Sequence, residues 1–378
     1  MKILKFPVYP VFLWTGFFLS CHPSVLPRSA EITFLPGVHI AEKATQSAYL
    51  SDIDLASVVH AYVIRVPVDW AALEPDSGVV DHAYLQEITQ RLEYAHQRGI
   101  RVVLLFTQSP YWASGSPDPA MPPRPGYEAM YAFALKNLYL SLSDPARDAL
   151  IAVEIWNEPN SIEFWPRYSN PRQGTYVLVP LHAAAEYAQL LQISYQILKP
   201  VMPHLSILGG SLASADTAYL HALFTALDTS APSMDGLALH PYTRVDEHPG
   251  DHYGYAQYPD QCNLDDPLSP PWCFQEGLHI TRELLNQSGY PQLPIWITEF
   301  GVSSDTGWGD AGSEEEQALH LQISLQILRD SARNWNVISA IWYRLRDEGP
   351  DHFGLFTEQN QKKRSAERFQ SFFQDVLP

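Results

Sequence analysis

Residues 151–160 read IAVEIWNEPN, and residues 294–301 read PIWITEFG. Each stretch is a short apolar run, typical of a buried strand, and each contains a glutamate where the run ends: Glu158 in the first and Glu299 in the second. A carboxylate loses hydration when it is buried, so a glutamate in such a place needs a compensating role. Two strand ends of this kind, with room between them for two further strand–helix units, predict that the carboxylates act as a pair.

The rest of the chain alternates short β-branched or aromatic runs with longer amphipathic segments, which is typical of parallel βαβ units. We expect eight strands, near residues 37–40, 62–68, 102–106, 151–156, 206–208, 236–240, 295–298 and 340–343. We expect helices at 84–97, 127–142, 183–198, 219–227, 314–334 and 366–376. Eight such units in one chain predict an α/β fold, a single (β/α)8 TIM barrel over residues 31–378.

A doubly wound sheet is the alternative fold, but the chain has no Gly-x-Gly-x-x-Gly after its first strand and no phosphate-binding loop. Long connections are expected after the fourth, sixth and seventh strands, over residues 164–180, 243–272 and 303–313. All three follow carboxyl ends of strands, which is the face where barrel enzymes build their sites. We therefore expect the functional site there.

Charge and composition narrow the partners. Asp and Glu number 42 against 24 Lys and Arg, a formal net charge of −18. That balance argues against nucleic acid and anionic membranes as partners, because phosphate contacts need clustered basic side chains. Aromatic residues are abundant, with 10 Trp, 20 Tyr and 16 Phe. Most are expected to fill the core, and only those on loops near the glutamates are candidates for stacking on sugar rings.

The first 21 residues predict an export signal, with Lys2 and Lys5 before an apolar stretch at 8–19. Ser20-Cys21 then matches the end of a bacterial lipoprotein signal, so Cys21 is the candidate lipidation site, and a retained membrane anchor is the alternative. Either predicts an exported protein: secreted, periplasmic or on the cell surface. In such a compartment Cys262 and Cys273, which bracket a loop-like stretch, are expected to form a disulfide, the alternative being two free thiols.

In its motifs the chain resembles glycoside hydrolase clan A, the barrel enzymes with catalytic glutamates on strands 4 and 7. Residues 156–160 (WNEPN) match that clan's acid/base motif, and residues 297–301 (ITEFG) match its nucleophile motif. Residues 108–112 (QSPYW) resemble family 39 rather than family 5, in which a His is usual nearby, and residues 353–356 (FGLF) also recur in these families. The resemblance covers nearly the whole chain after the signal. The other positions that match the clan, and that we take as candidates for binding the substrate, are Arg65 on strand 2, Trp112 after strand 3, Asn157 beside the acid/base, His240 and Tyr242 after strand 6, and Trp342 on strand 8.

The resemblance implies a retaining β-glycoside hydrolase that acts on an oligo- or polysaccharide by double displacement. Glu299 is the expected nucleophile, kept ionised by Arg65 and Tyr242, and Glu158 is the expected acid/base, kept protonated by burial and nearby negative charge. Asn157 is expected to bond the sugar 2-hydroxyl, and Trp112 and Trp342 to be sugar platforms. Trp165, Trp272 and Trp308 are candidates for outer subsites or for packing within their own loops.

Several alternatives stay open at this stage. Arg65 could pair with Glu154, which we expect to be structural, and His240 could be a core histidine. A transglycosylase would use the same residues, and a non-catalytic carbohydrate-binding lipoprotein would be a decayed member of the clan. A metal-dependent barrel hydrolase is disfavoured because no two of the 14 His form a His-x-His pair. We expect neither a metal nor a cofactor, and gluco-, manno-, xylo- and galacto-configured substrates all fit these residues.

Overall fold

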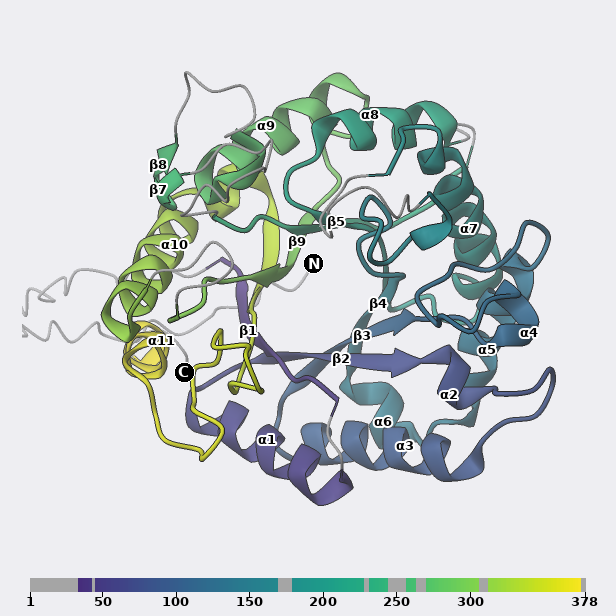
Figure 1. Cartoon of the computed structure of the whole chain (residues 1–378), viewed down its shortest axis with the longest axis horizontal. Coiled ribbons are helices and arrows are strands. Elements are labelled where there is room, and N and C mark those ends of the chain that lie inside the picture. The colour runs from purple at the N-terminus through teal and green to yellow at the C-terminus, as the bar shows by residue number, and fades with distance from the viewer. Residues whose placement is uncertain are drawn as a thin grey trace, which may run out of the picture.

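Eight parallel strands close into a barrel in the computed structural model, which describes residues 33–42, 45–168, 179–227, 231–243, 256–262, 270–305 and 312–374 (Figure 1). The strands lie around the barrel in the order β1-β10-β9-β6-β5-β4-β3-β2. Helices between the strands form a ring outside them, which confirms the predicted TIM barrel. The predicted signal segment with Cys21, and Trp308, lie outside the described residues.

The barrel strands are β1 (Leu35–His39), β2 (Val63–Asp69), β3 (Arg101–Thr107), β4 (Leu150–Ile155), β5 (Ser206–Ala213), β6 (Gly236–His240), β9 (Ile295–Phe300) and β10 (Val337–Trp342). The longer helices are α1 (Gln46–Val58), α3 (His82–Gln97), α5 (Glu128–Ser141), α7 (Ala183–Leu198), α8 (Thr217–Ala226), α9 (Phe274–Gln287), α10 (Glu314–Trp335) and α11 (Arg364–Gln374). Shorter elements are α2 (Trp70–Leu73), α4 (Tyr111–Ser114), α6 (Asp144–Ala149), η1 (Pro166–Tyr168), η2 (Pro270–Trp272), and the hairpin strands β7 (Ala256–Tyr258) and β8 (Gln261–Cys262).

Two apolar layers hold the barrel together. The larger lies between the strands and the helix ring, and includes Trp70, Trp156 and Trp342. The smaller fills the barrel itself with one side chain from each of seven strands: Val63, Val103, Ala152, Leu208, Ala238, Trp296 and Ile341. On β1 the equivalent position is Gly37, where a Cβ would stand 2.7 Å from the Val63 carbonyl oxygen. The interior is therefore packed below the site, with no room for a channel.

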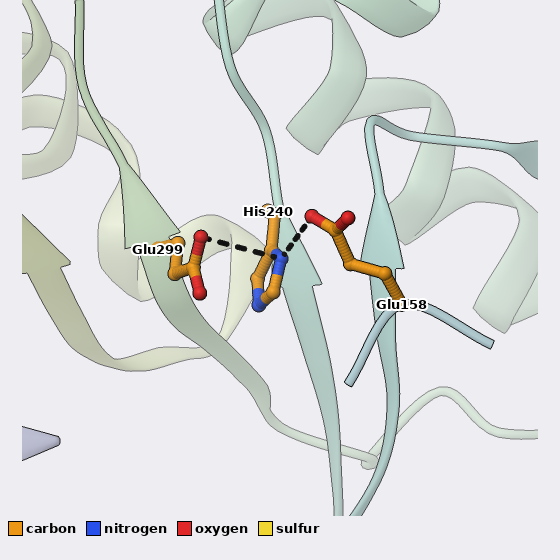
Figure 2. Close-up of side chains that lie close together, drawn as sticks. All are labelled: Glu158, His240 and Glu299. Carbon is orange, nitrogen blue, oxygen red and sulfur yellow. Dashed lines mark hydrogen bonds and ion pairs between the residues drawn. The ribbon is translucent and has the colours of Figure 1, made fainter. Parts of the chain in front are cut away.

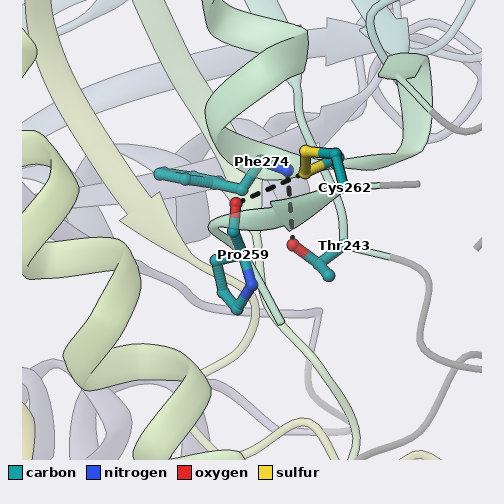
Figure 3. Close-up of a disulfide and its surroundings, with 5 residues drawn as sticks. Thr243, Pro259, Cys262 and Phe274 are labelled. Atoms are coloured by element: carbon teal, nitrogen blue, oxygen red, sulfur yellow. Dashed lines mark hydrogen bonds between the residues drawn. A yellow bond between two sulfur atoms is a disulfide. The ribbon is translucent and has the colours of Figure 1, made fainter. Parts of the chain in front are cut away.

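One connection at the mouth of the barrel is cross-linked. Cys262 at the end of β8 forms a disulfide with Cys273, the residue before α9, with the two Cα atoms 5.7 Å apart (Figure 3). The backbone N–H of Phe274 donates to the Thr243 hydroxyl at 3.4 Å, so the start of α9 is also tied to the end of β6. None of the helices in the described ranges has the length and apolar character needed to cross a membrane.

Candidate active site

The site begins directly above the smaller apolar layer, the one that plugs the inside of the barrel. Successive side chains of a strand point to opposite faces, so positions two residues beyond the plug face the same interior nearer the mouth. Those positions hold Arg65 on β2, Glu154 on β4, His240 on β6 and Thr298 on β9, and none of the four is more than 1% exposed. Over two residues along each strand, at its carboxyl end, the side chains inside the barrel therefore change from apolar to mainly ionisable.

Arg65 connects two of the predicted site residues, Asn157 and Glu299, with Glu154, which was predicted to be structural. Its Nε donates to Glu154 Oε2 at 2.6 Å, its Nη2 donates to Asn157 Oδ1 at 2.9 Å, and its Nη1 donates to Glu299 Oε1. Burial alone would lower the pKa of Arg65, but the charges of Glu154 and Glu299 raise it well above its ordinary value. Arg65 thus pairs with Glu154 and with Glu299 at once. The structural pairing and the role in the site, which the sequence offered as alternatives, both hold.

Glu299 is held as a carboxylate. The residue is 8% exposed, and its Oε2 accepts a hydrogen bond of 2.7 Å from the Tyr242 hydroxyl. Although burial opposes ionisation, the positive charges of His240 and Arg65 lower the pKa of Glu299 from 4.5 to about 2. An ionised oxygen at the mouth of the barrel can attack an electrophilic carbon.

Glu158 is held in the opposite state. It follows β4 in the left-handed region, with φ of 38°, and its backbone N–H donates to the Ser211 carbonyl at 3.0 Å. Such a conformation is costly for a residue with a side chain, and this hydrogen bond to β5 stabilises it. Burial raises the pKa of Glu158 above 4.5; the hydrogen bond and charge of His240 act to lower it, and the charge of Glu299 adds to the rise. A buried carboxyl of this kind can keep a proton to donate.

His240 lies between the two glutamates, as Figure 2 shows. Its Nδ1 is 2.8 Å from Glu158 Oε1 and 3.8 Å from Glu299 Oε2. Burial would lower the pKa of His240, but the surrounding Glu299, Glu154 and Glu158 raise it from 6.5 to about 9. One ligand atom from each of Glu158, His240 and Glu299 lies within 4.8 Å of the others. Hydrogen bonds from His240, Arg65 and Tyr242 already use these atoms, so the trio is better arranged to handle protons than to hold a metal ion.

Trp342 and Trp112, the two tryptophans predicted to be sugar platforms, make their contacts within the protein and not with the two glutamates. Trp342 is 1% exposed, packs edge-on against Phe300, and donates its indole N–H to the Phe353 carbonyl at 3.0 Å. The physical reason is strand parity: Ile341 points into the barrel, so Trp342 points out into the layer under the helices. Trp112 packs edge-on against Trp70 and donates to the Glu74 carbonyl at 2.9 Å, contacts that tie it to α2 rather than to the glutamates.

The candidate outer-subsite residues are also packed into the protein. Trp165 is 2% exposed and meets Trp156 and Tyr187 edge-on, and Trp272 is 6% exposed. Their low exposure favours packing within the protein over a role in outer sugar subsites.

Three residues that the sequence motifs did not single out enter the site. Tyr343 follows the parity of Ile341 and packs against His39 with ring centroids 5.2 Å apart and against Tyr242 at 6.3 Å. His39 is 7% exposed, its Nδ1 has no hydrogen-bond partner among the described residues, and burial and the charge of Arg65 lower its pKa to about 3. Thr298 bonds both Glu154 and His240. Counting in steps of two from each strand's apolar run would have found all three.

Comparison with known proteins gives one sequence match. No family model matches the chain. A β-xylosidase of Geobacillus stearothermophilus is 27% identical over 150 residues, which is 40% of this chain and 26% of that enzyme. The match thus spans about a quarter of the length of the curated relative.

Solved structures share the whole barrel. A family 39 glycoside hydrolase from the gut symbiont Bacteroides cellulosilyticus WH2 superposes with a TM-score of 0.63 at 20% identity, covering 90% of this chain and 63% of that one. The β-glycosidase BGL167 superposes with a TM-score of 0.66 at 17% identity, covering 92% and 98%. These structures confirm the predicted fold: the chain has a (β/α)8 barrel like that of solved glycoside hydrolases, and the xylosidase match is the similarity in sequence that accompanies it.

Proposed function

We propose that the protein is a retaining β-glycoside hydrolase with Glu299 as nucleophile and Glu158 as acid/base. The observation that carries the proposal is the pairing of opposite protonation states across a short gap. Oxygens of the two carboxyls lie within 4.8 Å, and the pKa of Glu299 is lowered while that of Glu158 is raised. Retaining glycosidases place their carboxyls about 5–5.5 Å apart and inverting ones about 6.5–9.5 Å apart, so the spacing favours retention.

The steps follow from these states. Glu299 attacks the anomeric carbon and Glu158 gives its proton to the departing oxygen, leaving a glycosyl ester on Glu299. Neutralising Glu299 removes the negative charge that raised the pKa of Glu158, so Glu158 can then take a proton from water as that water attacks the ester carbon. Asn157, oriented by Arg65, is placed beside Glu158 to bond a hydroxyl of the sugar.

The aromatic wall of the site is assigned to Tyr343 and His39. Their rings pack together beside Tyr242, whose hydroxyl bonds Glu299. We assign the sugar-facing role expected of Trp342 to Tyr343, and we assign to His39, through its unpartnered nitrogen, a hydrogen bond to a sugar hydroxyl. Trp112 is left with a role in positioning the loop after β3.

The substrate is proposed from the relatives. The sequence match is to an enzyme named as a β-xylosidase, so aryl β-xylosides are the first probes, beside β-glucosides and β-mannosides. Product anomer, followed by NMR in the first minutes of reaction, tests the stereochemistry: β product supports retention and α product refutes it.

Variants test the assignment of the glutamates. Glu299→Gln should abolish turnover. Glu158→Gln should depress turnover of substrates with poor leaving groups by about 10²–10⁴-fold and of activated aryl glycosides far less, because only the former need the proton. Glu87→Gln is the matched control, since Glu87 also pairs with a buried arginine, Arg91, but on the outside of the barrel. Equal effects of Glu158→Gln on both substrate types would contradict its role as acid.

A transglycosylase and a sugar-binding protein remain the competing functions. A transglycosylase would transfer the glycosyl group to an added sugar in preference to water, which product analysis with an acceptor sugar reveals. A binder would hold sugar in the wild type without cleaving any member of the panel.

Export is proposed from residues 1–21, with lipid attachment at Cys21, and the Cys262–Cys273 disulfide supports an oxidising compartment. Expression of the full chain in a Gram-negative host tests both parts. The protein should leave the cytoplasm, and labelled fatty acid should enter the wild type but not the Cys21→Ser variant.

A further inference from the structure

A line of hydrogen bonds runs beneath the site from Glu154 to Glu158. The Thr298 hydroxyl donates to Glu154 Oε1 at 2.6 Å, and the same hydroxyl oxygen is 3.1 Å from Nε2 of His240. The other ring nitrogen, Nδ1, is 2.8 Å from Glu158 Oε1. Glu154 and Thr298 are both 0% exposed, so neither can reach a sugar in the pocket. They can influence the site only through the residues they bond, and of these His240 is the one that reaches Glu158.

The direction of each bond follows from the charge on Glu154. Burial opposes ionisation, but the charge of Arg65 lowers the pKa of Glu154 well below its ordinary value. An ionised carboxylate only accepts hydrogen bonds, and Glu154 accepts them from Arg65, from Thr298 and from the Ser211 hydroxyl. Because Thr298 has one hydroxyl hydrogen and gives it to Glu154, its oxygen must accept from His240. The Nε2 of His240 therefore carries a hydrogen.

We propose that Glu154 and Thr298 are positioning residues that hold His240 in its Nε2–H tautomer, so that Nδ1 is reserved for exchanging one proton with Glu158. The step is balanced within one hydrogen bond. The proton leaves Nδ1 and bonds to Oε1 of Glu158, which turns an imidazolium and a carboxylate into a neutral ring and a carboxylic acid, and it returns by the same route. This inference rests on the proposed function only for the use of that proton; the tautomer itself is independent of it.

The charges around His240 support a shared proton. Glu154 and Glu158 face it from β4 and the residues after it, Glu299 faces it from β9, and Arg65 of β2 lies behind Glu154 and Glu299. Three carboxylates against one guanidinium favour an added positive charge on the ring. Because Thr298 keeps the hydrogen on Nε2, the added proton binds at Nδ1, beside Glu158.

Nitrogen NMR of the full-length protein labelled with 15N-histidine tests the tautomer directly. Long-range 1H–15N spectra, recorded above and below the pKa of about 9, distinguish a protonated ring nitrogen from a bare one. The His240 signals are those that disappear in His240→Asn. We expect a protonated Nε2 at every pH and an Nδ1 that changes state. A ring protonated at Nδ1 alone at high pH would overturn the inference.

Three substitutions separate the tautomer from simple packing. Thr298→Val keeps the shape and removes the acceptor, so it should unfix the tautomer and move the alkaline limb of kcat/KM down by about one pH unit. Thr298→Ser keeps the hydroxyl and should restore both. Ser211→Ala is the matched control, because it removes the other hydroxyl that donates to the same Glu154 oxygen. Thr298→Val behaving like Ser211→Ala in both readouts would overturn the proposal.

Glu154→Gln should reverse the tautomer of His240. Its amide can donate to Thr298, which turns the Thr298 hydroxyl toward Nε2 and moves the ring hydrogen to Nδ1. The expected result is an Nδ1–H tautomer and a loss of about 10²-fold in kcat on poor leaving groups. A protein with the Nε2–H tautomer that cleaves no glycoside would refute the proposed function alone. A protein that cleaves glycosides with an Nδ1–H tautomer would refute this inference alone.

Discussion

Arg65 is the residue on which the charge of the site depends, because one guanidinium bonds Glu154, Glu299 and Asn157 at once. Lysine carries the same charge but not the planar fork, so Arg65→Lys should lose most of these bonds. The pKa of Glu299 should then rise from about 2 toward its ordinary value. We expect the acid limb of kcat/KM to move to higher pH and kcat/KM to fall by about 10²–10³-fold.

The control is the same substitution at a second buried arginine. Arg91 is 2% exposed and pairs with Glu42 and Glu87 in the helix layer, away from the barrel interior. Arg91→Lys should lower thermal stability and leave the pH profile of kcat/KM unchanged. If both variants shift the profile alike, Arg65 acts on the site only through stability.

Tyr343 and Trp342 are neighbours whose substitutions should have opposite signatures. Tyr343 faces the site beside His39 and Tyr242, so Tyr343→Ala should raise KM by about tenfold or more, the loss of one stacked ring, with little change in melting temperature. Trp342→Ala should lower unfolding free energy by about 3–5 kcal/mol, the usual result of emptying a buried tryptophan site. Steady-state kinetics beside urea unfolding separates the two, and a KM effect confined to Trp342→Ala would reverse the assignment.

At the scale of elements, Asn160 fastens the acid/base loop to the next strand. Its amide accepts from Ala213 N–H at 3.0 Å and donates to the Ala213 carbonyl at 3.0 Å and to Asp216 Oδ2 at 3.2 Å. Asn160→Asp would set two buried carboxylates against each other and should cost about 3 kcal/mol in urea unfolding. The pKa of Asp216 is already raised by burial, so this cost should shrink as the pH falls.

The swapped pair is the control for that prediction. Asn160→Asp combined with Asp216→Asn exchanges the carboxylate and the amide, and so restores a donor opposite an acceptor. It should regain a large part of the lost stability. If the double variant is no more stable than Asn160→Asp, charge between the two side chains is not the cause.

How far the elements could be predicted depends on whether their pattern is local. The strands β4 and β9 are continuous apolar runs and were predicted nearly to their ends. The strand β5 was predicted at 206–208 but extends over Ser206–Ala213, because Gly209 and Gly210 hide a strand that bulges between Gly210 and Leu212. Helix α1 was not predicted: Asp52 is 1% exposed on its core face and pairs with Arg346, a partner almost 300 residues away.

The same limit applies to the site. Residues with a chemical role, such as Glu158, Glu299 and Arg65, could be found one by one because ionisable residues inside apolar runs are unusual. The hydrogen bonds that connect them could not be predicted from the sequence. Thr298 has a hydroxyl that only the assembled barrel places between Glu154 and His240. The strand-8 motif likewise did not show that Trp342 lies in the apolar layer under the helices.

For the whole molecule, the buried charges of the site predict how stability varies with pH. Glu299 has a pKa of about 2 in the folded protein against 4.5, so the stability it contributes is complete above about pH 4.5 and is lost as the pH falls toward 2. His240 has a pKa of about 9 against 6.5, so its contribution is complete below 6.5 and is lost as the pH rises through 9. The site thus favours a stability plateau between about pH 4.5 and 6.5.

Melting temperatures across this range check the prediction, and two variants assign its limbs. Buried carboxyls with raised pKa values, such as Asp216, oppose the acid limb, so the comparison with wild type matters more than the absolute curve. Glu299→Gln should make the fall below pH 4.5 shallower and leave the alkaline side in place, apart from the loss of its pull on His240. His240→Asn should flatten the fall between pH 6.5 and 9. An alkaline limb as steep in His240→Asn as in wild type would mean that the histidine does not carry its extra proton in the folded protein.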